Sequence, residues 1–194
     1  MSSLGSLEES PLCNPLMRME IRFDGLQNVG GLRTVNGARF GMVRNGGARP
    51  HQGVDLYAQP GTKVFAVASG EIVRIRHHDA SYGQDILLRF RPDSRVASFL
   101  KMSGSLPPDG TLYVLYAHLS SISARLGPVK RGEAIGATGV SGNADQRYPH
   151  LHFEIRKVKS PGLGLHNRLN PELIFSGIDY SKPVEALDRF SRTA

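Results

Sequence analysis

The fold is decided by the stretch GVDLYAQPGTKVFAVASGEIVRIR, residues 53–76. Apolar and polar residues alternate in residues 53–57, 62–68 and 71–76, and the dipeptides Pro60-Gly61 and Ser69-Gly70 separate these runs. A period of two is typical of strands with one buried face, and Pro and Gly favour tight turns. The stretch therefore predicts three consecutive antiparallel strands.

The same pattern continues along the chain. Further strands are predicted at residues 84–90, 111–117, 134–137 and 151–158, with a short one at 19–23. A helix is predicted only at 171–175, where Asn170 can cap the first turn and Pro171 suits its start. The 22 glycines and 12 prolines favour short strands joined by turns over long helices. We therefore expect a mainly β fold.

One main domain is expected, because 194 residues suffice for a single core. Its predicted bounds are residues 39–176. Residues 1–38 are interpreted as an N-terminal extension, and residues 177–194 as a C-terminal tail that forms a short helix or a frayed end. Residues 91–110 are interpreted as an insertion around the apolar island at 96–102, either an elaborated hairpin or a surface lobe.

The chain carries a formal net charge of +7, which would suit an anionic partner. Its densest basic groups, at 74–76, 89–91 and 156–159, lie in or beside strand-like runs, so we interpret them as solvated faces. The sequence offers no aromatic stacking platform and no DNA-binding helix motif. A nucleic-acid-binding β module would therefore rest on charge alone, and we expect no nucleic-acid partner.

Two features bear on where the protein acts. Cys13 is the only cysteine, so we interpret it as a free thiol near the N-terminus, away from any nucleophile motif. The first twenty residues show no basic start leading into an apolar stretch, and no apolar run reaches about 18 residues. We therefore expect no ordinary signal peptide and no membrane insertion.

Three separated strings carry the candidate chemistry: His51-Gln-Gly-Val-Asp55, Tyr116-Ala-His118 and His150-Leu-His152-Phe-Glu154. Residues at i and i+2 of a strand share a face, so His150 and His152 can point into one site. Leu151 and Phe153 would then pack on the other side. The remaining histidines, His77, His78 and His166, are interpreted as loop or surface residues.

Zinc binds imidazole nitrogen and carboxylate oxygen, and a catalytic zinc site uses three protein ligands with one position left open. His51, Asp55 and one of His150 and His152 satisfy that count. Such an ion polarises a scissile carbonyl and lowers the pKa of its bound water from 15.7 to roughly 7, while unligated histidines move protons and stabilise the oxyanion. Each string alone fits a structural histidine or a turn-capping aspartate equally well. Their combination at strand and turn positions favours a site.

These residues resemble a known family, the lysostaphin and LytM-like zinc endopeptidases that cleave the peptide bridges or stems of bacterial peptidoglycan. The resemblance covers about residues 39–175, with motifs in the family's order. They are Phe40-Gly41, His51-Gln-Gly-Val-Asp55, Ala58-Gln-Pro-Gly-Thr62, Ala66-Val-Ala-Ser-Gly70, Tyr116-Ala-His-Leu-Ser120, Gly132-Glu-Ala-Ile-Gly136, Thr138-Gly139 and Pro149-His-Leu-His-Phe-Glu154.

By this resemblance, His51, Asp55 and His152 are the ligands of one zinc ion per chain, and His118 and His150 are the catalytic histidines. The implied fold is a compact two-sheet antiparallel β structure of the duplicated hybrid motif type, with a short C-terminal helix. The implied activity is hydrolysis of peptidoglycan cross-links or bridges by zinc-activated water. The alternative is a non-catalytic family member that activates another cell-wall hydrolase.

Two stretches depart from the family's pattern. Ser141–Tyr148 is longer than the usual loop before the histidine pair, and residues 91–110 are inserted, so both are expected to reshape the groove. A peptidoglycan substrate implies action in the periplasm or cell wall. Without an ordinary signal peptide, this implies either a trimmed chain or a non-classical or dedicated secretion route. The second case would suit an antibacterial effector, with an immunity protein or a secretion partner.

Overall fold

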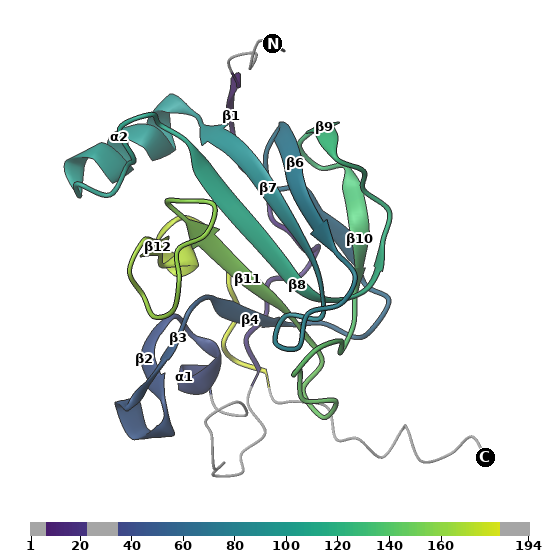
Figure 1. The fold of residues 1–194 in the computed structure, drawn as a ribbon. Coiled ribbons are helices and arrows are strands. Elements are labelled where there is room, and N and C mark those ends of the chain that lie inside the picture. The colour runs from purple at the N-terminus through teal and green to yellow at the C-terminus, as the bar shows by residue number, and fades with distance from the viewer. Residues whose placement is uncertain (1–6, 23–34, 183–194) are drawn as a thin grey trace.

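The computed structural model describes residues 7–22 and 35–182, and this part of the chain is mainly β (Figure 1). The strands are β1 (Glu9–Ser10), β2 (Gly41–Arg44), β3 (Arg49–His51), β4 (Val54–Tyr57), β5 (Lys63–Phe65), β6 (Gly70–Arg76), β7 (Gln84–Pro92), β8 (Leu112–Ile122), β9 (Gly127–Val129), β10 (Ala134–Thr138), β11 (His150–Arg156) and β12 (Arg168–Leu169). The helices are α1 (Val35–Ala38) and α2 (Ser94–Met102), with two 3-10 helices, η1 (Asn45–Gly47) and η2 (Pro171–Leu173).

Most strands belong to one ten-stranded sheet, whose central order is β12-β11-β8-β7-β6-β9. β4 pairs with β11, and β10 pairs with both β5 and β8. β1 pairs with β7 in parallel, whereas the other described pairs are antiparallel, including the separate β2–β3 hairpin. The prediction of a mainly β, antiparallel fold is confirmed.

The three strands predicted within residues 53–76 are present as β4, β5 and β6, but among the described residues they do not pair with one another. β4 pairs with β11, β5 with β10, and β6 with β7 and β9. The three strands exist as predicted, but the prediction that they pair with one another in sequence order was therefore wrong. Alternation shows which face of a strand is buried, whereas the choice of partner depends on contacts far along the chain.

The predicted insertion at 91–110 contains a helix, α2, so the expectation of a helix only at 171–175 was wrong. The Asp93 side chain accepts a hydrogen bond from the Val96 amide at 3.0 Å and caps the helix. Val96 and Leu100, one turn apart, are its buried residues. The predicted helix at 171–175 is the 3-10 helix η2, and Asn170 caps it as expected by accepting from the Glu172 amide.

The ends of the described chain differ from the predictions in detail. In place of the short strand expected at 19–23, Glu20 forms a single parallel bridge with Asp179, and residue 23 lies outside the described residues. Most of the predicted helix or frayed end after residue 181 also lies outside them. The division at residue 39 stays a prediction, but Leu16, Met19 and Ile21 belong to the same apolar cluster as the strands.

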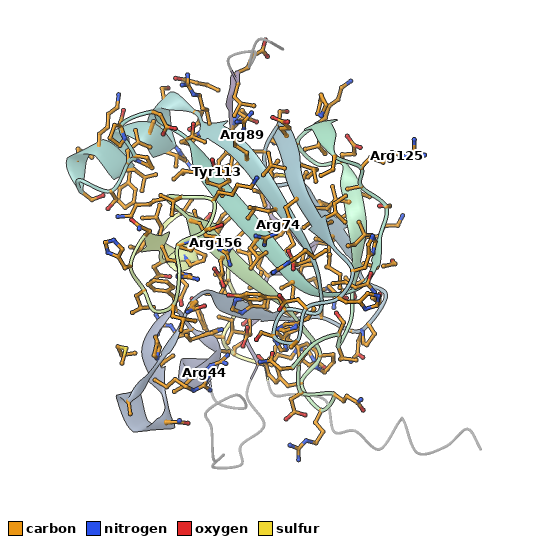
Figure 2. All side chains as sticks on the ribbon, viewed as in Figure 1. Arg44, Arg74, Arg89, Tyr113, Arg125 and Arg156 are labelled. Atoms are coloured by element: carbon orange, nitrogen blue, oxygen red, sulfur yellow. The ribbon has the colours of Figure 1, made fainter. Side chains whose placement is uncertain are left out.

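The sheet formed by β6, β7, β8 and β11 has two unlike faces. One face, here called the core face, carries the main apolar cluster, including Phe90, Tyr116 and Phe153. The other face, here called the polar face, carries His152, Glu154 and Arg156 of β11, Tyr113, Leu115 and Ala117 of β8, Asp85, Leu87 and Arg89 of β7, and Arg74 of β6. Figure 2 shows Arg74, Arg89, Tyr113 and Arg156 together on this side.

Candidate metal centre

His51, Asp55 and His152 come together where the β2–β3 hairpin meets β4 and β11. Asp55 and His152 are directly opposite each other in the antiparallel β4–β11 pair, so their side chains share a face. His51 ends β3, and two residues separate it from the start of β4. Gly53 permits this approach, since a Cβ at that position would lie 2.4 Å from the Phe153 carbonyl oxygen. The strand pairing therefore positions the three side chains.

The donor atoms of these three residues form a tight triangle. The Asp55 Oδ1 atom lies 2.8 Å from His152 Nδ1 and 3.1 Å from His51 Nε2, and the two nitrogens are 3.2 Å apart. All three residues are buried. A tetrahedral zinc ion with bonds of about 2.0–2.1 Å separates its donors by about 3.3 Å. The triangle needs to widen only slightly to hold a metal, so this donor set fits zinc.

The other ring nitrogen of each histidine and the other carboxylate oxygen of Asp55 are also hydrogen bonded. His51 Nδ1 donates to the Arg39 carbonyl oxygen at 2.8 Å, and His152 Nε2 lies 3.0 Å from Glu154 Oε1. The Asp55 Oδ2 atom accepts a hydrogen bond from the Arg44 guanidinium at 2.5 Å. Metal-binding histidines usually donate their other ring nitrogen to a carbonyl or carboxylate in this way, which fixes their orientation.

His118 and His150 lie beside the triangle, with ring centroids 4.9 Å apart. His150 Nε2 is 3.5 Å from Asp55 Oδ1. Nδ1 of His118 donates to the Ser141 carbonyl oxygen, and Nδ1 of His150 donates to that of Tyr148. These bonds leave the Nε2 lone pair of each neutral ring unshared with the backbone. His118 also has a φ of 62°, a left-handed conformation that is uncommon for a non-glycine residue and typical of functional sites.

Burial and hydrogen bonding together set the protonation states of the four histidines. Burial lowers the pKa of His51 and of His150, and burial together with the neighbouring imidazoles lowers the pKa of His118 to about 3. Burial also opposes a charge on His152, but its hydrogen bonds to Asp55 and Glu154 outweigh that effect and raise its pKa to about 9. At neutral pH, therefore, His118 and His150 are neutral proton acceptors.

A buried ionic network behind His152 was missed by the sequence analysis. Glu154 Oε1 accepts from the Tyr82 hydroxyl at 2.8 Å, and Oε2 accepts from Nε of Arg156 at 2.6 Å and of Arg168 at 2.9 Å. Burial alone would raise the pKa of Glu154, but its hydrogen bond with His152 and the charges of His152 and Arg156 hold that pKa well below its usual range. Arg156 is 4% exposed, so its interpretation as part of a solvated face was wrong.

Some of these residues left a signal in the sequence. Glu154 follows His152 at i+2 in an alternating strand, so its place on the same face could have been inferred. Arg44, Tyr82 and Arg168 left none, because they reach the site from separate segments. The other predicted surface histidines, His77, His78 and His166, are exposed.

A groove of about 500 Å³ opens onto the cluster. Its lining comes from the β2–β3 hairpin (Arg44, Arg49, Pro50), from the five histidine and aspartate residues, from Gln52, Ser81 and Tyr82, from Asn143, Ala144 and Asp145, and from Leu163 and Gly164. The long loop at 141–148 thus forms one wall, as its position before the histidine pair suggested. Among the described residues, none from 91–110 lines this groove. In Figure 1, α2 follows the end of β7 that is farther from β4.

The sequence profile of peptidase family M23 matches residues 49–163. A DD-carboxypeptidase/endopeptidase of Neisseria meningitidis is 32% identical over 108 residues, or 56% of this chain and 20% of that protein. Lysostaphin of Staphylococcus staphylolyticus is 34% identical over 117 residues, or 60% of this chain and 20% of that protein. The chain thus spans about a fifth of the length of these curated relatives.

Among solved structures, a mutant form of the catalytic domain of the prophage-encoded M23 protein EnpA from Enterococcus faecalis has a similar fold. It is 19% identical, with a TM-score of 0.50, and the match covers 84% of this chain and 95% of that one. At this identity the similarity concerns the fold alone. No helix in residues 7–22 or 35–182 has the length and apolar character needed to cross a membrane.

Proposed function

The chain belongs to peptidase family M23, and from this premise we propose that it is a zinc-dependent endopeptidase that hydrolyses the peptide cross-links or bridges of bacterial peptidoglycan. The observation that carries the proposal is the buried triangle of His51, Asp55 and His152 at the floor of an open groove. The cluster meets the ligand count and chemistry of a catalytic zinc site.

His51 Nε2, Asp55 Oδ1 and His152 Nδ1 would hold the ion. When bound, zinc supplies Lewis acidity, which polarises the scissile carbonyl and makes water a nucleophile at neutral pH. Arg44 holds Asp55 by its other oxygen, and Glu154 holds His152 by its other nitrogen. These contacts fix the donors in place, so little reorganisation is needed when a metal binds.

His118 and His150 would serve as the catalytic histidines. Each is kept neutral at pH 7 because burial lowers its pKa, and each donates Nδ1 to a backbone carbonyl. Their Nε2 atoms are therefore the basic positions, able to accept a proton from the attacking water and return it to the leaving amine. In the protonated form the same nitrogens can donate to a developing oxyanion.

The test is the release of soluble fragments from purified peptidoglycan sacculi by zinc-loaded protein. We expect His118→Ala to abolish release while about one zinc stays bound, and His51→Ala to lose both zinc and activity. His78→Ala, which changes an exposed histidine outside the groove, is the matched control and should leave both unchanged.

Full activity of both the His118→Ala and His51→Ala proteins would contradict the proposal. A zinc-loaded wild-type protein that released nothing but stimulated an amidase would favour the non-catalytic alternative. Mass spectrometry of the released fragments would identify the bond that is cut.

For such an enzyme the place of action is the periplasm or cell wall, where peptidoglycan lies. The antibacterial role rests on the proposed activity and predicts toxicity only outside the cytoplasm. Bacteria expressing the chain with an attached signal sequence should lyse, whereas those expressing it in the cytoplasm should grow. Equal toxicity from both locations would contradict this role.

A further inference from the structure

Two arginines face each other across the β2–β3 hairpin at the edge of the groove. Arg44 and Arg49 are partners in the antiparallel pair, so their side chains project to the same side, and both line the groove. Like charges directly opposite one another destabilise a hairpin. An anion bound between them would offset that cost.

The two guanidinium groups are not equivalent. Arg44 is committed to the protein, since Nε donates to the Gly37 carbonyl oxygen and a terminal nitrogen donates to Asp55. Arg49 is exposed, and its guanidinium group has no hydrogen bond or ion pair with any residue in the part of the chain that the structure describes. Its donors are therefore available to a ligand in the groove.

The position of Arg49 limits the chemistry of that ligand. The groove that it lines also contains His51 and Asp55, so a peptide that lies along the groove can contact Arg49 and the metal centre at once. A guanidinium group binds a planar carboxylate through two parallel hydrogen bonds. Carboxylate is the anionic group of peptides, and a chain of glycines has none between its ends.

We propose that Arg49, with Arg44 beside it, forms a subsite for a carboxylate of the peptide substrate. The subsite rests on the proposed function and sharpens it, because it favours cross-links between stem peptides, which carry carboxylates, over glycine bridges. The carboxylate is either the main-chain carboxylate that ends a stem peptide or a side-chain carboxylate next to the scissile bond.

The test uses synthetic dimeric stem peptides in three forms: with all carboxylates free, with the terminal carboxylate amidated, and with the side-chain carboxylate amidated. For each peptide, kcat/KM is measured with zinc-loaded wild-type, Arg49→Gln, Arg49→Lys and Arg125→Gln proteins. Arg125 is the matched control, because it is exposed and lies on the other side of the molecule from Arg44 (Figure 2). Binding of the same peptides to zinc-loaded His118→Ala protein, with and without Arg49→Gln, gives a readout without turnover.

Amidating the recognised carboxylate should lower kcat/KM about tenfold in wild-type and Arg125→Gln proteins, as the loss of a charge-assisted hydrogen bond predicts. Arg49→Gln should remove this discrimination and Arg49→Lys should restore part of it. The amidated position that matters identifies the source of the carboxylate. The subsite is overturned if Arg49→Gln discriminates as strongly as wild type, or if wild type cuts all three peptides equally.

Equal cleavage of all three peptides by wild type would overturn the subsite but leave the proposed function intact. A wild-type protein that cuts no peptidoglycan overturns the proposed function, and the binding measurement then decides the subsite alone: equal binding of free and amidated peptides overturns it, and preference for the free carboxylate supports it.

Discussion

On the core face of β11, Phe153 and Ile155 lie among apolar side chains, whereas on the polar face of the same strand His152, Glu154 and Arg156 lie among charged and polar groups. All five side chains are buried. The two sets alternate along one strand, so the difference arises from the sequence of β11 and from the strands that flank it.

The energetic roles of the faces should differ accordingly. Burial of apolar area on the core face is a direct source of stability. Burying charges costs free energy that their pairing only offsets, so an ionic network contributes more to the orientation of groups than to stability. We therefore expect changes on the core face to alter the free energy of unfolding, and changes on the polar face near His152 to alter metal binding.

The largest effect on stability should come from the core face. Phe90→Ala removes a ring that is 1% exposed, and it should lower the free energy of unfolding by about 3–5 kcal/mol. Zinc affinity of the folded protein should not change, because Phe90 lies on β7 and not at the metal centre. Chemical denaturation and zinc competition with a chromophoric chelator measure the two quantities. If Phe90→Ala lowered zinc affinity as well as stability, the two faces would not have the separate roles described above.

Metal removal should have the next largest effect. A ligand that binds only the folded state at one hundred times its Kd adds about 2.7 kcal/mol of stability. Wild-type protein should therefore melt at a lower temperature after chelation and recover when zinc is restored. Asp55→Asn keeps the size of the side chain but weakens a ligand, so its melting temperature should respond much less. An equal response to zinc in both proteins would place the metal elsewhere.

Glu154→Gln tests the polar face directly. The substitution removes the charge that orients His152, and such changes typically weaken metal binding by about 10–100-fold. Glu71→Gln is the matched control, because it makes the same chemical change at a half-exposed ion pair with Arg89, remote from the metal centre. Its zinc affinity should equal that of wild type, and its stability should change by less than about 1 kcal/mol. Equal zinc affinities for all three proteins would show that Glu154 does not orient His152.

Wild-type and Glu154→Gln proteins should also differ in how their stability depends on pH. In metal-free protein the pKa of Glu154 is lowered on folding, mainly by His152 and Arg156 acting against burial, so its charge stabilises the fold above the unfolded pKa of about 4.3. That contribution is lost as the pH falls through the lower folded pKa. The difference in free energy of unfolding between wild type and Glu154→Gln should therefore be largest between about pH 4.3 and 6.5 and shrink below about pH 4. It should also shrink as the pH rises from about 6.5 towards 9, because Glu154 helps to raise the pKa of His152 to about 9 in the folded protein. A difference that grows in acid would contradict this assignment.

Much of the fold could be predicted because alternation reports burial directly. The strands at Gln84, Ala134 and His150 begin within a residue of their predicted starts. The pairing of strands could not be predicted, because β4 pairs with β11, which lies almost one hundred residues later, and no local sequence pattern indicates that partner. The helix α2 was missed although Asp93 and the Val96–Leu100 spacing were visible, because the apolar residues were interpreted only as an island.

The candidate site divides in the same way. Local spacing predicted that His51 and Asp55 act together and that His150 and His152 share a face. Only the family resemblance chose between His150 and His152 as a ligand, and it alone assigned His118 to catalysis; these roles stay predictions. Arg44 and Arg168 could not be foreseen, because a long side chain reaching from another segment leaves no periodic pattern.

The most direct test of the metal centre is anomalous X-ray diffraction from crystals of the zinc-loaded protein, recorded on both sides of the zinc absorption edge. We predict one strong anomalous peak bounded by His51 Nε2, Asp55 Oδ1 and His152 Nδ1. Absence of a peak from that position, or a single peak at an exposed histidine such as His78 or His166, would contradict the account.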